Sequence, residues 1–143
     1  MAAQRTAEVV WEGNLLEGAG TVRMVSSGAF GEYPVTWASR AEDPQGRTSP
    51  EELMAAAHAA CYAMAFSHHL AGKDMPPERL TVSATYTFVP GTGITEAQLD
   101  VSGSVPGLSA EEFAEEAKEG ESKCPVSNAV RGNVEITLNA SPA

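Results

Sequence analysis

Alternating hydrophobic and polar residues predict strands in both halves of this chain. In the first part, three short β-rich runs are separated by turn residues such as Ser27-Gly28, which is typical of a meander. Two longer alternating runs flank Pro90-Gly91 and predict a hairpin, and a final run lies near the C-terminus. The predicted strands span residues 6–12, 20–25, 33–39, 80–89, 94–105 and 134–138.

One long helix is predicted between the two groups of strands, from about residue 50 to residue 70. Pro50 has no N–H to leave unpaired at a first helical position, and the two carboxylates that follow it complement the positive end of the helix dipole. Residues 53–66 are apolar apart from His58, so this helix has almost no polar face. A helix that is apolar on all sides must be buried on all sides, and one chain of 143 residues with short strands cannot cover it alone. We therefore expect a partner chain.

The rest of the pattern indicates the α+β class. Ser109 and Glu112 have the spacing of a capping box at the start of a second helix, and Pro125 suits the first turn of a third. A polar loop and these two helices are predicted at residues 40–47, 109–120 and 124–130. Because helices do not alternate singly with strands, we expect an α+β fold rather than a doubly wound sheet, in a single domain over residues 1–143.

Charge and composition disfavour several classes of protein. Nineteen acidic side chains against nine basic ones give a net charge of −10, and affinity for nucleic acid rests on cationic side chains. The longest apolar run, residues 53–66, is shorter than the roughly 20 residues that span a bilayer. The N-terminal segment lacks the basic stretch and apolar core of a secretion signal. We therefore expect a cytoplasmic protein that binds neither nucleic acid nor membranes.

The two cysteines are the candidate reactive groups. Cys61 lies in the middle of the apolar helix, where burial without a nearby cation raises the pKa of a thiol above about 8.5 and leaves it unreactive. Cys124 precedes Pro125 at a predicted helix start, where free backbone N–H groups stabilise a thiolate. The cysteines are 63 positions apart, so only tertiary structure can bring them together. Two unlinked, buried and unreactive thiols are the alternative.

Two motifs together resemble the OsmC/Ohr family of thiol peroxidases. They are the helix sequence at residues 48–67, TSPEELMAAAHAACYAMAFS, and Lys123-Cys-Pro-Val-Ser127. Further similar residues are Trp11-Glu-Gly13, Gly20-Thr-Val22 and Arg40. His58 before Ala-Ala-Cys is more similar to the OsmC branch than to the Ohr branch. The resemblance covers nearly the whole chain and implies two antiparallel sheets wrapped around long central helices in an intertwined homodimer.

The resemblance also implies an activity. The protein would reduce organic hydroperoxides, and hydrogen peroxide more weakly, in defence against oxidative or osmotic stress. Cys61 would attack the peroxide and become a sulfenic acid, which Cys124 would resolve to a disulfide. Arg40 would supply the cation that ionises Cys61, and Glu51 would hold its guanidinium in place. The resemblance implies no bound cofactor, and as reductant a dithiol such as a dihydrolipoyl group on a partner protein.

The position of Glu51 leaves two arrangements open. Glu51 and Cys61 are 10 positions apart on one predicted helix, which corresponds to about 15 Å along its axis. Either a long Arg40 side chain bridges part of this distance, or Glu51 completes the site of a partner subunit, which is the hypothesis we favour. Arg47 and Glu52 are neighbouring charges that compete for the roles of Arg40 and Glu51.

Two other interpretations compete with a peroxidase site. Four possible metal ligands lie in one sector of the helical wheel: His58, Cys61, His68 and His69. Cys61 and His68 are two turns apart, about 10 Å, which is too far for one ion, so we expect a hydrogen-bonded core His58 and a pair of histidines at the emerging end of the helix. The second interpretation is a non-catalytic module that binds a small lipophilic ligand in the same apolar cleft. The helix side chains predicted for the core are Met54, Tyr62, Met64 and Phe66.

Overall fold

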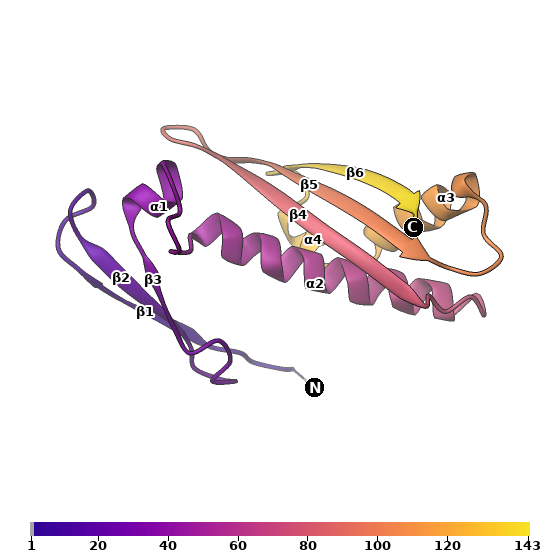
Figure 1. The fold of residues 1–143 in the computed structure, drawn as a ribbon, viewed down its shortest axis with the longest axis horizontal. Coiled ribbons are helices and arrows are strands. Elements are labelled where there is room, and N and C mark those ends of the chain that lie inside the picture. The colour runs from indigo at the N-terminus through magenta and orange to yellow at the C-terminus, as the bar shows by residue number, and fades with distance from the viewer. Residues whose placement is uncertain (1) are drawn as a thin grey trace. The chain divides into compact units, whose positions relative to one another are not determined.

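The structure, a computed structural model, describes residues 2–143 and contains two groups of strands (Figure 1). Along the chain, two helices separate the groups and two more precede the last strand. Its elements are, in chain order, β1 (Ala7–Glu12), β2 (Ala19–Met24), β3 (Glu32–Val35), α1 (Trp37–Ala41), α2 (Pro50–Ala71), β4 (Arg79–Val89), β5 (Gly93–Ser104), α3 (Ala110–Ser122), α4 (Pro125–Val130) and β6 (Glu135–Pro142). They form two compact units, one up to Pro50 and one from Glu51 to Ala143. The predicted α+β class is confirmed.

The first unit is the predicted antiparallel meander, in the order β1-β2-β3. Its third strand is shorter than predicted, because Thr36 begins helix α1 instead of continuing β3. The Ser39 backbone N–H donates to Thr36 Oγ1 at 3.0 Å, and the Thr36 backbone N–H donates to Ser39 Oγ at 3.0 Å. These local bonds form a capping box that competes with strand pairing. As a result Arg40 lies in the last turn of α1, and the prediction of a loop from residue 40 was wrong for its first two residues.

Strand β1 is exposed along its entire length, and hydrophobic side chains of this first unit are exposed as well. Leu16 and Phe30 keep 72% and 74% of their surface accessible, whereas Val22 is buried at 5%. A sheet that leaves this much apolar surface uncovered is typical of a segment that packs against something else.

The second unit contains a three-stranded sheet in the order β4-β5-β6. The predicted hairpin of β4 and β5 is confirmed and is antiparallel, from the pair Arg79 and Ser104 to the pair Val89 and Gly93. Strand β6 pairs parallel to β5, so the expectation of two purely antiparallel sheets was wrong for this one. Parallel neighbours need a long crossover, and α3 and α4 supply it between β5 and β6.

Helix α2, α3 and the sheet of the second unit share one hydrophobic core. From α2, the side chains of Tyr62, Phe66 and Leu70 are fully buried, and they pack with Leu99 and Val101 of β5 and with Phe113 and Ala117 of α3. Phe66 meets Phe113 edge to face, with ring centroids 5.6 Å apart. Each such side chain contributes about 1.5–3 kcal/mol on burial. The core therefore fixes the face of α2 that carries these aromatic rings.

The opposite face of α2 is exposed in the single chain. A row of residues four positions apart, Ala56, Ala60 and Met64, is accessible, and Met64 keeps 71% of its surface. Met64 was predicted in the core and is not part of the core of this chain, whereas the predictions for Tyr62 and Phe66 are confirmed. No helix within residues 2–143 combines the length and the apolar character that a membrane crossing requires.

Candidate active site

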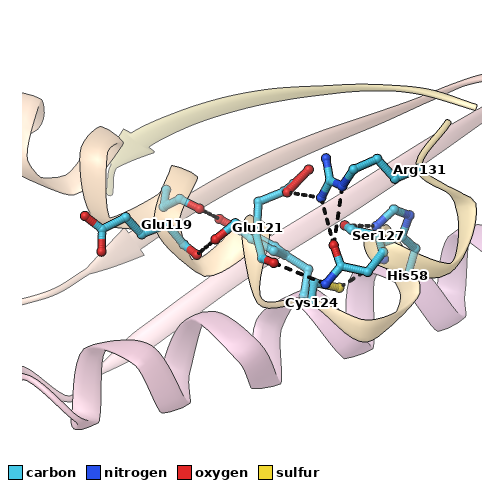
Figure 2. A network of polar contacts seen from close by, with 10 residues as sticks. His58, Glu119, Glu121, Cys124, Ser127 and Arg131 are labelled. Atoms are coloured by element: carbon cyan, nitrogen blue, oxygen red, sulfur yellow. Dashed lines mark hydrogen bonds and ion pairs between the residues drawn. The ribbon is translucent and has the colours of Figure 1, made fainter.

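Cys124 sits at the start of helix α4 and is fully buried. Pro125 occupies the first helical position, where its missing N–H costs nothing. The Ser127 backbone N–H, one turn further on, donates to Cys124 Sγ at 3.5 Å (Figure 2). The thiol of Cys124 therefore takes the position of a helix-capping acceptor, as the sequence predicted for this helix start.

Cys61 lies half-buried on α2, and the Cys124 side chain neighbours its thiol. Burial raises the pKa of the Cys61 thiol, a hydrogen bond from the Val126 backbone N–H opposes this rise, and the neighbouring Cys124 adds to it. Both thiols are free. Tertiary structure thus brings together two sulfurs that are 63 positions apart in the sequence, and the net effect of the surrounding groups of the second unit is to raise the pKa of the Cys61 thiol.

His58 is the buried centre of a hydrogen-bonded chain beside the two cysteines. Its Nδ1 lies 2.7 Å from Tyr86 Oη on β4, and its Nε2 lies 2.7 Å from Ser127 Oγ on α4. Burial lowers the pKa of the imidazole, and the negative charge of Glu121 offsets this only in part. The prediction of a hydrogen-bonded core histidine is confirmed, and both ring nitrogens that a metal ion would use have hydroxyl partners.

An ion pair ties the end of α4 to the end of α3. The Arg131 guanidinium faces Glu121 (Figure 2) and lies 2.7 Å from its Oε2. It also donates to Asn128 Oδ1 at 3.2 and 3.3 Å. The hydrogen bond with Glu121 raises the pKa of Arg131. Both ends of the short α4 helix are therefore held by side-chain bonds.

A second polar cluster surrounds His69 at the end of α2. His69 Nε2 lies 2.5 Å from Glu116 Oε2, and Lys123 Nζ lies 2.9 Å from His69 Nδ1. Lys73 Nζ contacts the other Glu116 oxygen at 2.7 Å, and Glu119 is 3.5 Å from the ring. His69 is buried at 7%, so its prediction as part of the emerging end of the helix was wrong.

This cluster is the one group of three possible metal ligands in the part of the chain that the structure describes: His69, Glu116 and Glu119. The ammonium groups of Lys73 and Lys123 already contact this cluster and balance its two carboxylates, so it is a salt-bridge network. The four residues weighed as metal ligands from the sequence are not brought together, since His58 bonds to hydroxyl groups and His68 is exposed. Residues 116, 119 and 123 have the i, i+3, i+7 spacing of one helix face, and this was the signal that sequence reasoning missed.

Arg40 and Glu51, the other two predicted site residues, are more buried than the neighbouring charges that compete for their roles. Arg40, in the first unit, is half-buried, whereas Arg47 is exposed. Glu51 is 6% exposed in the first turn of α2, whereas Glu52 is exposed. A carboxylate that is nearly buried at a helix start is more than a surface charge that complements the helix dipole. Both site candidates thus have the more enclosed positions.

The chain is similar to known proteins in both sequence and fold. Residues 42–139 match the family described as OsmC-like protein. The chain is 34% identical to peroxiredoxin OsmC of Escherichia coli over 142 residues, which cover 97% of this chain and 96% of the relative. It is 31% identical to an organic hydroperoxide resistance protein of Xanthomonas axonopodis over 94 residues, 64% of this chain and 65% of the relative. A crystal structure of an organic hydroperoxide resistance protein from Elizabethkingia anophelis superposes with a TM-score of 0.72 at 25% identity and covers 100% of both chains.

Proposed function

The chain belongs to the OsmC-like protein family, and from this premise we propose that it is a thiol-dependent peroxidase that reduces organic hydroperoxides and, more weakly, hydrogen peroxide. The names of its relatives, peroxiredoxin and organic hydroperoxide resistance protein, support a role in defence against peroxide stress. The observation that carries the proposal is that two thiols far apart in the sequence, Cys61 and Cys124, are neighbours in the fold and are both free of a disulfide.

In the first step, the Cys61 thiolate attacks the terminal oxygen of the hydroperoxide. The O–O bond breaks, the alkoxide takes up a proton and leaves as the alcohol, and Cys61 becomes a sulfenic acid. The peroxide is thereby reduced by two electrons, which the sulfur supplies. The apolar side chains that pack around Cys61 favour bulky organic peroxides over small polar ones.

In the second step, Cys124 resolves the sulfenic acid. Its sulfur forms the S–S bond with Cys61 while the S–OH bond breaks, and the hydroxide leaves as water with the proton of the Cys124 thiol. The contact between the two thiols supports this step, because a disulfide forms only between closely spaced cysteines. A dithiol then reduces the disulfide and closes on itself, and we propose dihydrolipoyl groups on a partner protein as its source.

The first step needs a cation, because the Cys61 thiol has a raised pKa among its own unit's residues. We assign this role to Arg40, whose planar guanidinium can face a carboxylate with one edge and the sulfur with the other. A shift of about 3 pKa units corresponds to about 4 kcal/mol, which one poorly solvated arginine contact can supply. Glu51 is the carboxylate that we propose holds the guanidinium, and its burial supports this choice.

We propose that the working protein is a homodimer in which both units of each chain form one domain. The exposed row of α2 with Ala56, Ala60 and Met64 supports this, and so does the exposed apolar surface of the first unit. Small side chains on a helix let another backbone approach closely, which suits a partner's helix. The proposed chemistry needs no cofactor. A dithiol reductant requires a reducing compartment, so we place the protein in the cytoplasm.

Intact mass and thiol counting after one equivalent of cumene hydroperoxide test the proposal. The reduced protein should lose two hydrogen atoms and both free thiols, and dihydrolipoamide should restore them. The variant Cys124→Ser should instead gain one oxygen on Cys61. If the protein is a non-catalytic module for a lipophilic ligand, the peroxide will leave both thiols intact, and that result overturns the proposal.

A further inference from the structure

Backbone N–H groups in the first turn of α4 interact with the sulfurs of both cysteines. The Val126 backbone N–H neighbours Cys61, and its interaction with the sulfur lowers the pKa of the thiol. The next residue, Ser127, donates its backbone N–H to Cys124 Sγ at 3.5 Å. Because Cys61 belongs to α2 and Cys124 caps α4, the distance between the sulfurs depends on how firmly α4 is held against α2.

The bond between His58 and Ser127 holds these two helices together at this point. His58 lies three residues before Cys61 on α2, and Ser127 lies three residues after Cys124 on α4. The Nε2 to Oγ distance is 2.7 Å, and both side chains are fully buried. Because both side chains are removed from bulk water, losing one partner leaves the other unpaired and weakens the hold of α4 on α2.

The far side of the imidazole is fixed as well. Tyr86 Oη on β4 lies 2.7 Å from His58 Nδ1, and the two rings meet nearly edge to face with centroids 5.7 Å apart. A neutral imidazole has one donor and one acceptor nitrogen, and the two hydroxyl groups satisfy both. The ring is therefore held between the sheet and α4 in one orientation.

We propose that His58 is a positioning residue for the resolving step: through Ser127 it holds Cys124 at bonding distance from Cys61, so that the sulfenic acid closes to a disulfide before a second peroxide reaches it. This inference rests on the proposed peroxidase function. Two reactions of the Cys61 sulfenic acid compete, closure and overoxidation. Closure joins Cys61–SOH and the Cys124 thiol and releases water, whereas overoxidation converts Cys61–SOH and a second hydroperoxide to sulfinic acid and alcohol. The His58–Ser127 bond favours closure.

The test compares variants that break the bond with one that keeps it. Ser127→Ala removes the hydroxyl but retains the backbone N–H that reaches Cys124, and His58→Leu removes the imidazole. His58→Gln keeps an amide nitrogen near the position of Nε2 and should restore closure. Tyr62→Phe is the matched control, because it removes another buried hydrogen bond of α2, the 2.8 Å bond to the Ala117 carbonyl on α3.

Rapid quenching with an alkylating agent and mass analysis give the rate of disulfide closure after one equivalent of cumene hydroperoxide. We expect Ser127→Ala and His58→Leu to close about 10- to 100-fold more slowly than the unmodified protein, since small misplacements of reacting groups have effects of this size. Both should form sulfinic acid on Cys61 at lower peroxide doses, whereas Tyr62→Phe and His58→Gln should behave like the unmodified protein. Closure at the normal rate in the first two variants, or equal slowing in Tyr62→Phe, overturns the inference.

Oxidation of the two thiols with diamide tests this inference independently of the proposed function. This azo oxidant takes two electrons and two protons from a pair of thiols and becomes a hydrazine, so it drives closure without peroxide. If the unmodified protein does not react with hydroperoxides, the proposed function fails, and closure by diamide still reports on the His58–Ser127 bond. Slower closure in Ser127→Ala than in Tyr62→Phe then supports the positioning role, and equal rates overturn it.

Discussion

His58 and Ser127 meet at 2.7 Å across 69 positions of sequence, with both side chains fully buried. The burial that makes this bond strong also disfavours a charged imidazole, and it lowers the pKa of His58. The hydroxyl oxygens of Ser127 and Tyr86 could accept from a protonated ring, so it is the burial of the charge, and not a missing partner, that disfavours this form. The bond therefore belongs to the neutral form of the ring.

Stability should consequently fall in mildly acidic solution. The unfolded chain binds a proton at His58 with a pKa of about 6.5, whereas the folded chain binds it only at lower pH. The contribution of His58 is complete above about pH 6.5 and is lost as the pH falls below that value, with a slope of at most about 1.4 kcal/mol per pH unit. Urea unfolding between about pH 5 and pH 7.5 measures this loss. In His58→Gln the same slope should be absent, and identical pH profiles for the two proteins contradict the prediction.

Replacing Arg40 tests the proposed origin of the Cys61 thiolate. In a Cys124→Ser background, Arg40→Met should move the pKa of Cys61 to that of free cysteine, about 8.5, or above. The rate with cumene hydroperoxide at neutral pH should then fall about 30-fold or more, because a thiol with a pKa of about 8.5 is only about 3% ionised at pH 7. The thiolate absorbance during a pH titration gives the midpoint. Arg47→Met is the matched control and should leave both quantities unchanged; an unmoved midpoint in Arg40→Met removes Arg40 from the mechanism.

Local patterns predicted the elements whose signals lie within a few residues. Helix α2 was predicted to within one residue at its end, because Pro50 and the apolar run that follows are local features. Helix α1 was missed, because five residues carry little periodicity and Trp37 resembles a strand residue. The parallel pairing of β6 also could not be predicted. Its direction beside β5 depends on the path of the chain through α3 and α4, and the sequence of β6 itself does not contain that information.

Local patterns in the sequence likewise could not predict the contacts of the site that join different elements. The contact of Cys61 with Cys124 was anticipated only through the paired motifs of a family, because no local rule links positions 63 residues apart. The partners of His58 and His69 come from other elements of the second unit, and a helical wheel of α2 does not contain them. This is why His69 was expected to be exposed, although it is buried beside Glu116.

Replacing Gly120 by a residue with a side chain should destabilise the protein. A Cβ added there would lie 3.0 Å from Cδ1 and 3.1 Å from Cα of Phe66, so the backbones of α3 and α2 would have to separate. We expect Gly120→Ala to lower the free energy of unfolding by about 1–3 kcal/mol, despite the better helix propensity of alanine. At Gly72 the nearest atoms would be 3.5 Å away, so Gly72→Ala should change stability by less than about 0.5 kcal/mol. Urea unfolding measures both, and equal effects contradict a close approach of the helices.

The Glu116 carboxylate should stabilise the fold except in acid. Its hydrogen bond with Lys73, and then that with His69, lower its pKa. This contribution is complete above the unfolded value of about 4.3 and is lost as the pH falls through the lower folded pKa. Glu116→Gln should lower the free energy of unfolding at neutral pH by about 1 kcal/mol and reduce the loss below about pH 4. Glu119 is 55% exposed, so Glu119→Gln should have the smaller effect; the reverse order would show that Glu116 is not the centre of the network.

Mixed subunits test whether Glu51 acts in the site of a partner. Helix α2 is continuous from Pro50 to Ala71, so Glu51 and Cys61 of one chain are separated by about 15 Å of helical rise. If Glu51 serves the partner's site, a heterodimer of Cys61→Ser and Glu51→Ala chains contains one intact site and should recover about half of the normal activity. Differently tagged chains allow such heterodimers to be purified and assayed with cumene hydroperoxide. As a control, Cys61→Ser combined with Cys124→Ala should recover no turnover, because the contact between Cys61 and Cys124 lies within one chain. A heterodimer with Glu51→Ala that stays inactive assigns Glu51 to its own chain's site and requires Arg40 to span the distance.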